Sequence, residues 1–323
     1  MMDKFKNIIS RFSKAKILVI GDLILDEFVW GSVSRISPEA PVPVVWIERE
    51  SYMPGGASNV ASNICSLEGK VYIAGAVGSD QRAERLIELL SEKGVATEGV
   101  IIDPSRPTTL KTRIIAGHQQ VVRVDREKTE PLPASILKDI VSYAEKIIPQ
   151  VDAVIIEDYG KGVITPALLK PIIKCARTHK KIITVDPKEE HLSYYKGVTS
   201  LTPNNHEASA VTGIKIKDDK TLKAAGEKIL KQLKSESVLI TLGEKGMCLF
   251  EKSNRVTHIP TAAQEVYDVS GAGDTVISVF TLALACGARM QDAAKISNIA
   301  AGIVVGKIGV AVTNQKELTE RIK

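Results

Sequence analysis

The stretch "YDVSGAGDTVISVF", Tyr267 to Phe280, sets three small residues and an aspartate between a polar run and an apolar one. The apolar residues predict a helix over 272–287, and the free N–H groups of its first turn would suit an anion such as a phosphate. Gly271 and Gly273 would let the backbone approach that ligand, and Asp274 could take a proton from an attacking hydroxyl. A plain helix start, capped by the serine before the glycines, explains the same residues, so other parts of the chain must decide between the two interpretations.

Elsewhere the chain predicts a mostly parallel sheet with helices on both faces. The segment "KILVIGD", 16–22, has the apolar, β-branched pattern of a buried first strand. Further strands are expected in "KVYIAGAVG", "DAVIIEDYG", "KIITVDP", "TSLTPN" and "SVLITLG", and helices at 134–148, from Thr165, at 205–211, 217–234, 272–287 and 290–305, the last two ending the chain. This alternation is typical of α/β proteins, which bind ligands beyond the carboxyl ends of their strands. The residues at such ends are Asp22, Asp158, Asp186, Asn204 and Gly243.

The segment "FVWGSVSRISPEAPVPVVWIE" is expected to lie outside that sheet. Its three prolines cannot donate hydrogen bonds within a sheet and belong at sheet edges. Two more strands are expected in "TTLKTRIIAG" and "QQVVRVD", joined near Gly117. We therefore expect a single domain, 1–323, with a small β lid formed by segments 28–49 and 108–124.

The composition is that of an ordinary globular protein. Hydrophobic residues make up 44% of the 323 residues and charged residues 25%, and the net charge of +5 comes without a lysine or arginine block. Nucleic-acid binding therefore has no compositional support. The chain shows neither a signal-peptide pattern nor an apolar run of roughly 20 residues, so we expect no membrane partner and a cytoplasmic protein. The four cysteines stand far apart, as free thiols in a reducing compartment would.

A second glycine site is expected at the same edge of the sheet. The segment "PGGASNV" places Gly55 and Gly56 at a helix start, followed by Asn59, and Asp22 ends the first strand. A carboxylate and an amide suit a ligand that is rich in hydroxyl groups. A turn residue at Asp22 and a surface helix residue at Asn59 are the plainer alternatives.

Two further motifs point to a nucleotide and its metal ion. "TPNNHEAS" sets Asn204 and Glu207 on one helix face, where their oxygens would suit Mg²⁺, although the same spacing makes a capping box. In "TLGEKGM", Thr241 and Gly243 end a strand and Gly246 follows a tight turn, which by itself is typical of an ordinary β-turn. No GxxxxGK[ST] motif is present and no GxGxxG motif follows the first strand, so a P-loop is excluded and a dinucleotide site is disfavoured.

The motifs "PGGASNVA", N-x-x-E, T-x-G-x-x-G and "DVSGAGD" follow one another in this order, and in them the chain resembles the ribokinase-like (PfkB) sugar kinases along nearly its whole length. The resemblance implies a three-layer α/β/α sandwich with a small β lid. Within that family, "SRISPEAPVPVV", "DYGKG", "LTPNNHEA", "QEVYDVSGAGDTV" and "AAGIVVGKIGV" resemble the members that phosphorylate D-glycero-D-manno-heptose 7-phosphate at C1, on the way to ADP-heptose for lipopolysaccharide. ATP-dependent phosphorylation of that sugar is the activity that the resemblance implies.

The resemblance also implies a role for each matching residue. Asp274 would be the base that deprotonates the sugar hydroxyl, and the amides of Gly271, Ala272 and Gly273 would form an anion hole for the transferred phosphoryl group. Asp22, Gly55, Gly56 and Asn59 would hold the sugar, Asn204 and Glu207 would organise Mg²⁺ and its waters, and Thr241, Gly243, Gly246, Asn298 and Gly302 would lie along ATP. A monovalent cation such as K⁺ could bind at Asp268 and the backbone near Val269 or Gly309. Lids often pair in this family, which implies a homodimer.

A substrate that carries a phosphate needs cationic partners, and an arginine fork matches phosphate oxygens well. The candidates are Arg35, Arg113 and Arg123 in the lid region and Lys161 in "DYGKG". Each of them could instead be an ordinary solvated charge. Lys188, after "VDP", could reach the phosphates of ATP.

Two positions depart from the family pattern. Ser270 replaces the threonine that commonly precedes Gly-Ala-Gly-Asp. Glu157 stands where a small residue is expected, and its charge would count against a phosphorylated sugar if it faced the phosphate. The bifunctional relatives carry a nucleotidyltransferase domain after the kinase, whereas this chain ends at Lys323, so kinase activity alone is expected.

Two alternatives stay open at this point. The chain could phosphorylate another sugar or sugar phosphate, such as ribose or fructose 6-phosphate. It could also be a non-catalytic sensor of sugars or nucleotides with the same fold, although the presence of Gly271, Gly273 and Asp274 disfavours a sensor.

Overall fold

The structure, a computed structural model, describes residues 2–117, 119–263, 265–307 and 309–322, and its main body contains a nine-stranded sheet. In spatial order the strands are β13 (Val256–Ile259), β12 (Met247–Glu251), β11 (Ser237–Thr241), β10 (Ser200–Leu201), β9 (Ile182–Asp186), β8 (Ala153–Glu157), β1 (Lys16–Gly21), β4 (Lys70–Val77) and β5 (Ala96–Ile102). Neighbouring strands from β11 to β5 run parallel, and β12 runs antiparallel to both of its neighbours. The predicted α/β class with a mostly parallel sheet is confirmed.

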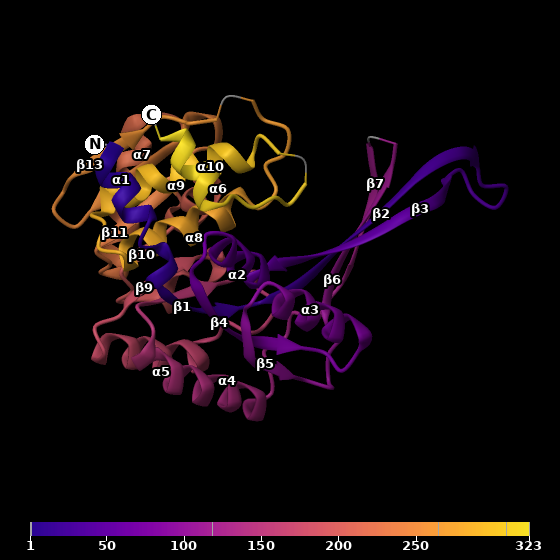
Figure 1. The fold of residues 1–323 in the computed structure, drawn as a ribbon, viewed down its shortest axis with the longest axis horizontal. Coiled ribbons are helices and arrows are strands. Elements are labelled where there is room, and N and C mark those ends of the chain that lie inside the picture. Colours follow the sequence, from indigo (N-terminus) through magenta and orange to yellow (C-terminus); the bar gives the residue numbers. More distant parts are fainter. Residues whose placement is uncertain (1, 118, 264, 308, 323) are drawn as a thin grey trace.

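Helices cover both faces of this sheet (Figure 1). One layer holds α1 (Met2–Ile9), α2 (Ala57–Ser66), α3 (Gln81–Glu92), α8 (Ala272–Ala285), α9 (Met290–Val304) and α10 (Gln315–Arg321), and the other holds α4 (Ala134–Ile147), α5 (Pro166–Thr178), α6 (Asn205–Thr212) and α7 (Asp219–Leu233). Helix α5 illustrates how they attach, because Leu168, Leu169, Ile172 and Ile173 are buried at the three- and four-residue spacing of one helix face.

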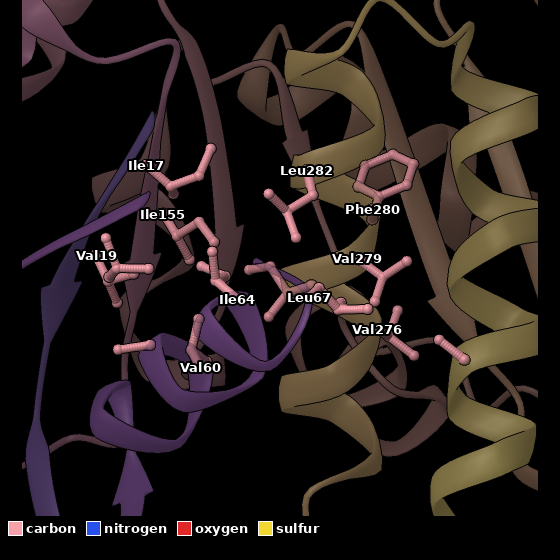
Figure 2. Close-up of a cluster of buried hydrophobic side chains, with 14 of the residues drawn as sticks. Ile17, Val19, Val60, Ile64, Leu67, Ile155, Val276, Val279, Phe280 and Leu282 are labelled. Carbon is pink, nitrogen blue, oxygen red and sulfur yellow. The ribbon is translucent and has the colours of Figure 1, made fainter. Parts of the chain in front are cut away.

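Strand β1 shows why the sheet needs both layers. Ile17 and Val19 pack in the core beneath α2 and α8, whereas Leu18 and Ile20 pack in the core on the other face. Successive side chains of a strand point to opposite faces, so a strand that is buried on both sides must be apolar throughout. Figure 2 shows the first of these cores, where side chains of α2 and α8 lie over Ile17 and Val19.

A four-stranded sheet forms a lid that extends away from the main body (Figure 1). Its strands, in spatial order, are β3 (Pro43–Gly56), β2 (Leu23–Ile36), β6 (Thr109–Ala116) and β7 (Gln119–Arg126). Only Asp22 separates β1 from β2, so the chain enters the lid directly from the carboxyl end of β1. The expected lid segments 28–49 and 108–124 fall in this sheet and its connections, except that residue 118 lies outside the described ranges.

Two elements go beyond the sequence prediction. Strand β5 extends the sheet beside β4, although its sequence "ATEGVII" does not alternate between apolar and polar residues. The expectation that the chain ends with the helix at 290–305 is wrong, because α10 follows it. A capping box of Asn314 and Glu317 starts α10, which at seven residues is too short to show a clear periodic pattern. No helix within the described ranges combines the length and the apolar content that a bilayer crossing demands.

Candidate active site

Three carboxylates meet at the carboxyl ends of the central strands. Glu157 ends β8 and Asp186 ends β9, and the two residues are partners in the parallel register of these strands. Asp274 reaches the same place from the first turn of α8. One oxygen of each carboxylate lies within 4.8 Å of the others. The sequence predicts Asp186 and Asp274 at this edge of the sheet, but not the approach of Glu157.

Both carboxylate oxygens of Asp274 accept hydrogen bonds. Asn59 of α2 donates its side-chain amide to Oδ2, and the Tyr159 hydroxyl donates to Oδ1 at 2.9 Å. Burial raises the pKa of Asp274, although the bonds from Asn59 and Tyr159 oppose the shift. A carboxylate with a raised pKa is the stronger proton acceptor once it is ionised, which suits a general base. The structure thus brings the predicted residues Asn59 and Asp274 into contact and adds Tyr159, which lies in the motif "DYGKG" but had no role assigned to it.

Glu157 is fully buried, and neither of its carboxylate oxygens has a hydrogen-bond partner among the described residues. Burial, followed by the charges of Asp186 and Asp274, raises the pKa of Glu157 well above the usual range. The protonated, neutral form is therefore favoured, because a buried charge without a partner is costly. The negative charge that would count against a phosphorylated sugar is suppressed by this burial.

Asp22 occupies the corner between β1 and β2 and is 1% exposed. Its Oδ2 accepts the backbone N–H groups of Tyr159 and Lys161 at 2.9 and 3.0 Å, and its Oδ1 accepts that of Val163 at 3.2 Å. Burial raises the pKa of Asp22 to about 6, with a neighbouring aspartate contributing, although these N–H groups lower it. The carboxylate that the sequence predicts to hold the sugar therefore holds the loop 159–163 and has little accepting capacity left.

Gly55 and Gly56 make room for the side chain of Asp26 in β2 and for the backbone of Asp22. A Cβ on Gly55 would lie 2.3 Å from Oδ2 of Asp26, and one on Gly56 would lie 2.6 Å from the carbonyl oxygen of Asp22. Asp26 is 6% exposed and forms an ion pair with Arg113. Sequence reasoning missed Asp26, although a second acid four residues after Asp22 in "GDLILD" is a visible signal.

Of the basic residues predicted to bind the substrate phosphate, Arg113 lies next to Asp26 and Lys161 lies next to Asp22. Their side chains are 19% and 17% exposed, and each forms an ion pair, with Asp26 and Glu127 respectively. The other candidates are more exposed to solvent. Arg123 is half exposed and pairs with Asp125 of its own strand, and Arg35 is exposed at the far end of β2. Lys188 pairs with the two glutamates that follow it. The geometry therefore favours Arg113 and Lys161.

The residues predicted to lie along ATP line one cavity of about 370 Å³. Its mainly apolar walls come from the end of β11, the start of β12, α9 and the first turn of α8. The predicted residues in its lining are Thr241, Gly243, Gly246, Ala272, Gly273, Asn298 and Gly302. Gly302 is tightly packed, because a Cβ there would lie 2.8 Å from the carbonyl carbon of Ala262. A larger recess of about 670 Å³ lies beside Gly160 and Lys188, and none of the predicted nucleotide residues lines it.

Asn204 and Glu207 form the capping box that their spacing allows. The Asn204 side chain accepts the N–H of Glu207 at 2.9 Å, and Oε2 of Glu207 accepts the N–H of Asn204 at 2.8 Å. An isolated β-bridge joins Asn204 to Thr241, so the box lies beside the 370 Å³ cavity. Since Oε1 of Glu207 takes no part in the box, this oxygen can still serve a cation or its waters.

The start of α8 differs from a plain capped helix. Its N-cap is Gly271, which has a left-handed φ of 77°, and no side chain caps the helix, so Ser270 does not play the role of the plain interpretation. The N–H of Ala272 donates to the Val269 carbonyl at 3.2 Å. The N–H groups of Gly271 and Gly273 have no acceptor among the described residues. Two free amides thus lie at the positive end of the helix.

Comparison with known proteins identifies the family of the chain. A family model described as "pfkB family carbohydrate kinase" matches residues 14–317. The chain belongs to this family of carbohydrate kinases. The family resemblance found in the motifs is confirmed, and the protein is a sugar kinase.

Other pfkB-related proteins resemble the chain over nearly its whole length. The bifunctional protein HldE of Desulfatibacillum aliphaticivorans is 45% identical over 315 residues, which are 98% of this chain and 64% of that protein. HldE of Geobacter metallireducens is 46% identical over 97% of this chain and 64% of that protein. The chain thus spans about 64% of the length of these curated relatives. Among solved structures, Arabidopsis thaliana ribokinase complexed with ribose and ATP has a TM-score of 0.77 at 20% identity, covering 96% of this chain and 99% of that one. Escherichia coli phosphofructokinase-2 in complex with substrates and products has a TM-score of 0.78 at 18% identity, covering 95% and 98%.

Membership of this kinase family implies ATP, usually together with Mg²⁺, and the residues present fit both. A mainly apolar cavity suits an adenine ring, and the two free amides at the start of α8 suit a phosphate. Glu207 leaves its Oε1 outside the capping box, next to this cavity. A carboxylate oxygen in such a place is the kind of ligand that a hard divalent cation prefers.

Proposed function

We propose that this kinase phosphorylates D-glycero-D-manno-heptose 7-phosphate at C1 and so makes a heptose 1,7-bisphosphate for ADP-heptose synthesis. The observation that carries the proposal is the position of Asp274, a buried carboxylate directly after Gly273, which lines the 370 Å³ cavity. A proton acceptor and a phosphate-binding helix start are thereby combined in one turn. The motifs shared with heptose 7-phosphate kinases and the similarity to HldE proteins support the choice of sugar.

In the proposed reaction Asp274 takes the proton of the C1 hydroxyl, whose oxygen attacks the γ-phosphorus of ATP in line while ADP leaves. The amides of Gly271 and Gly273 stabilise charge on the transferred group, whereas the amide of Ala272 is already bonded to a carbonyl. Asn59 gives up its bond to Asp274 when the sugar hydroxyl arrives. Closure of the lid excludes water, which otherwise competes as the nucleophile.

The other ligands follow from the same geometry. ATP would lie along the cavity lined by Thr241, Gly243, Gly246, Asn298 and Gly302. Mg²⁺ would neutralise phosphate charge, held directly or through waters by Glu207 and Asn204. The sugar would contact Asn59 and Asp26, in a space shaped by Asp22, Gly55 and Gly56. K⁺ at Asp268, Val269 and Gly309 is a further proposal. Because the reaction consumes ATP and the cysteines are free, we place the enzyme in the cytoplasm.

Release of ADP with a panel of sugars tests the proposed substrate. The panel contains heptose 7-phosphate, heptose without its phosphate, ribose, fructose 6-phosphate and a control without sugar. We expect the highest kcat/KM for heptose 7-phosphate and a large loss when the phosphate is absent. Activity on ribose or fructose 6-phosphate alone would overturn the substrate. A ligand-induced rise in Tm without any ADP release would favour the non-catalytic sensor.

Replacing Arg113 with alanine is expected to raise the KM for the phosphorylated sugar by roughly 10- to 100-fold, because a hydrogen bond between charged groups contributes about 1.5–3 kcal/mol. The KM for ATP should stay unchanged, since Arg113 lies in the lid and not in the 370 Å³ cavity. Steady-state kinetics with both substrates varied measures the two constants.

The matched control for this change is Arg85→Ala, which removes an exposed arginine from α3. A KM for the sugar phosphate that is equal in the two variants would show that Arg113 does not bind the phosphate.

The lid carries an apolar face that we propose to pair with a second copy of the chain. Val33, Ile47, Val122 and Val124 lie on the face opposite to Arg113, and they are 42%, 59%, 44% and 53% exposed. An apolar surface of this kind on a projecting sheet is typical of a contact between subunits.

Ile47→Asp is therefore expected to convert a dimer into a monomer, as measured by sedimentation equilibrium at several protein concentrations. Ile102→Asp is the control, because Ile102 is 53% exposed but belongs to β5 of the main body. A wild-type protein that is monomeric throughout, or an Ile47→Asp protein that remains dimeric, would refute pairing through this face.

A further inference from the structure

The proposed reaction assigns no role to the hydroxyl of Tyr159, which contacts the carboxylate of Asp274. It donates to Oδ1 at 2.9 Å, while the amide of Asn59 donates to Oδ2. The two donors differ in what they can do during the reaction. Asn59 has an amide that can turn to a sugar hydroxyl, because it both donates and accepts hydrogen bonds. The phenol of Tyr159 is carried by a rigid ring and by a loop that is held in place.

The loop that carries Tyr159 is held from two sides. Asp22 accepts the N–H groups of Tyr159, Lys161 and Val163, so three of its bonds go to this one loop. On the other side, the preceding residue, Asp158, accepts the N–H of Gly160 at 2.9 Å and the hydroxyl of the buried Tyr195 at 2.6 Å. A hydroxyl on such a loop has its position set by contacts that do not involve the substrate.

We propose that Tyr159 is a positioning residue for the base, and that Asp22 acts through it by fixing the loop. The inference rests on the proposed role of Asp274. With Oδ1 held by Tyr159, the carboxylate presents Oδ2 to the sugar hydroxyl when the bond from Asn59 is exchanged. The role of Asp22 is then to orient the base and not to bind the sugar.

The same hydrogen bond affects the protonation of Asp274. A donor to a carboxylate stabilises its ionised form, so Tyr159 lowers the pKa of Asp274 against the effect of burial. The other titratable groups that face Asp274 are Asp26, whose charge raises the pKa of Asp274, and the carboxyl groups of Glu157 and Asp186, whose own pKa values lie well above the usual range. Removal of the hydroxyl should therefore move the ionisation of Asp274 to higher pH.

Tyr159→Phe tests the proposal, with Tyr143→Phe as the matched control. The hydroxyl of Tyr143 is also buried, but it belongs to α4 and has no hydrogen-bond partner among the described residues. We expect Tyr159→Phe to lower kcat by roughly 10- to 100-fold, the effect of one hydrogen bond to a charged group, and to shift the acid limb of the kcat/KM profile to higher pH. Tyr143→Phe should leave the acid limb where it is. Equal acid limbs in Tyr159→Phe and the wild type would overturn the proposal.

A double-mutant cycle then tests the part of Asp22. If Asp22 acts through Tyr159, Asp22→Asn should lower kcat in the wild type but have little further effect in the Tyr159→Phe background. An Asp22→Asn change that raises only the KM for the sugar, equally in both backgrounds, would show that Asp22 binds the sugar and would refute this step.

A measurement without substrate separates the failure of this inference from the failure of the proposed function. Infrared titration of ¹³C-labelled aspartate carboxyl groups, assigned by comparison with Asp274→Asn, follows the ionisation of Asp274 directly. A shift to higher pH in Tyr159→Phe supports the contact even if Asp274 is not the base. An unchanged titration refutes the contact, whatever sugar the enzyme uses.

Discussion

Replacing Asp274 with asparagine is expected to lower kcat by about 10² to 10⁴-fold, the usual contribution of a general base. An asparagine has nearly the same shape as an aspartate, but it cannot take a proton from the sugar hydroxyl. Both oxygens of Asp274 accept hydrogen bonds, from Asn59 and Tyr159, so the amide nitrogen of the new residue must also face one of these donors. The loss should appear in kcat more than in the KM for ATP, and single-turnover phosphoryl transfer measures it.

The stability of this variant should not fall in the same way. Because burial raises the pKa of Asp274, the folded state binds the proton of this residue more tightly than the unfolded state does. The aspartate therefore lowers the free energy of unfolding as the pH rises from its unfolded pKa through its raised folded pKa. Asparagine removes this cost, so a Tm equal to or above that of the wild type is expected at neutral pH. Asp292→Asn is the control, since Asp292 is also buried in the first turn of a helix but pairs with Lys4 and Arg289. Near wild-type turnover in Asp274→Asn would remove Asp274 from the role of base.

The sequence predicts the fold because each strand and helix shows its pattern locally. The apolar run 16–21 requires burial on both faces, and the small residues from Gly271 to Gly273 allow a helix to begin beside a ligand. Part of the cavity that we propose for ATP is predictable for a related reason. Thr241 and Gly246 lie around one turn, and Asn298 and Gly302 lie one helical turn apart, so the members of each pair lie close together without any knowledge of long-range packing.

The acidic part of the site could not be predicted in this way, because it depends on strand register and on side-chain direction. Glu157 approaches Asp186 only because β8 and β9 pair with these residues opposite each other. Tyr159 reaches Asp274, 115 residues further along the chain, from a loop whose backbone N–H groups bond to Asp22. A sequence shows that an aspartate ends a strand, but not whether its oxygens meet a sugar or three backbone amides.

The same loop has a third support, besides Asp22 and Asp158, that the motifs do not show. Arg106 donates to Asp103 at 3.0 Å, to the carbonyl oxygen of Lys161 at 3.0 Å and to that of Glu130 at 2.9 Å. The side chains of Arg106 and Asp103 are only 6% and 2% exposed. Burial works against the ionised form of Asp103, but hydrogen bonds from Ser105 and Arg106 outweigh it and lower the pKa of Asp103. The guanidinium thus ties a buried charge to the loop that carries Tyr159.

Arg106→Ala is therefore expected to lower the free energy of unfolding by about 3–5 kcal/mol, because removal of one partner leaves the carboxylate of Asp103 buried without its counter-charge. Urea denaturation measures the loss. The loss should be largest above pH 4–5 and shrink as the pH falls through the lowered pKa of Asp103, since protonation then removes the unpaired charge.

The control is Arg85→Ala, which breaks an exposed ion pair and should cost less than about 1 kcal/mol. Since Arg106 also binds the loop 159–163, kcat should fall in the folded protein as well. A variant as stable as Arg85→Ala, with wild-type kcat, would show that Arg106 supports neither the fold nor the loop.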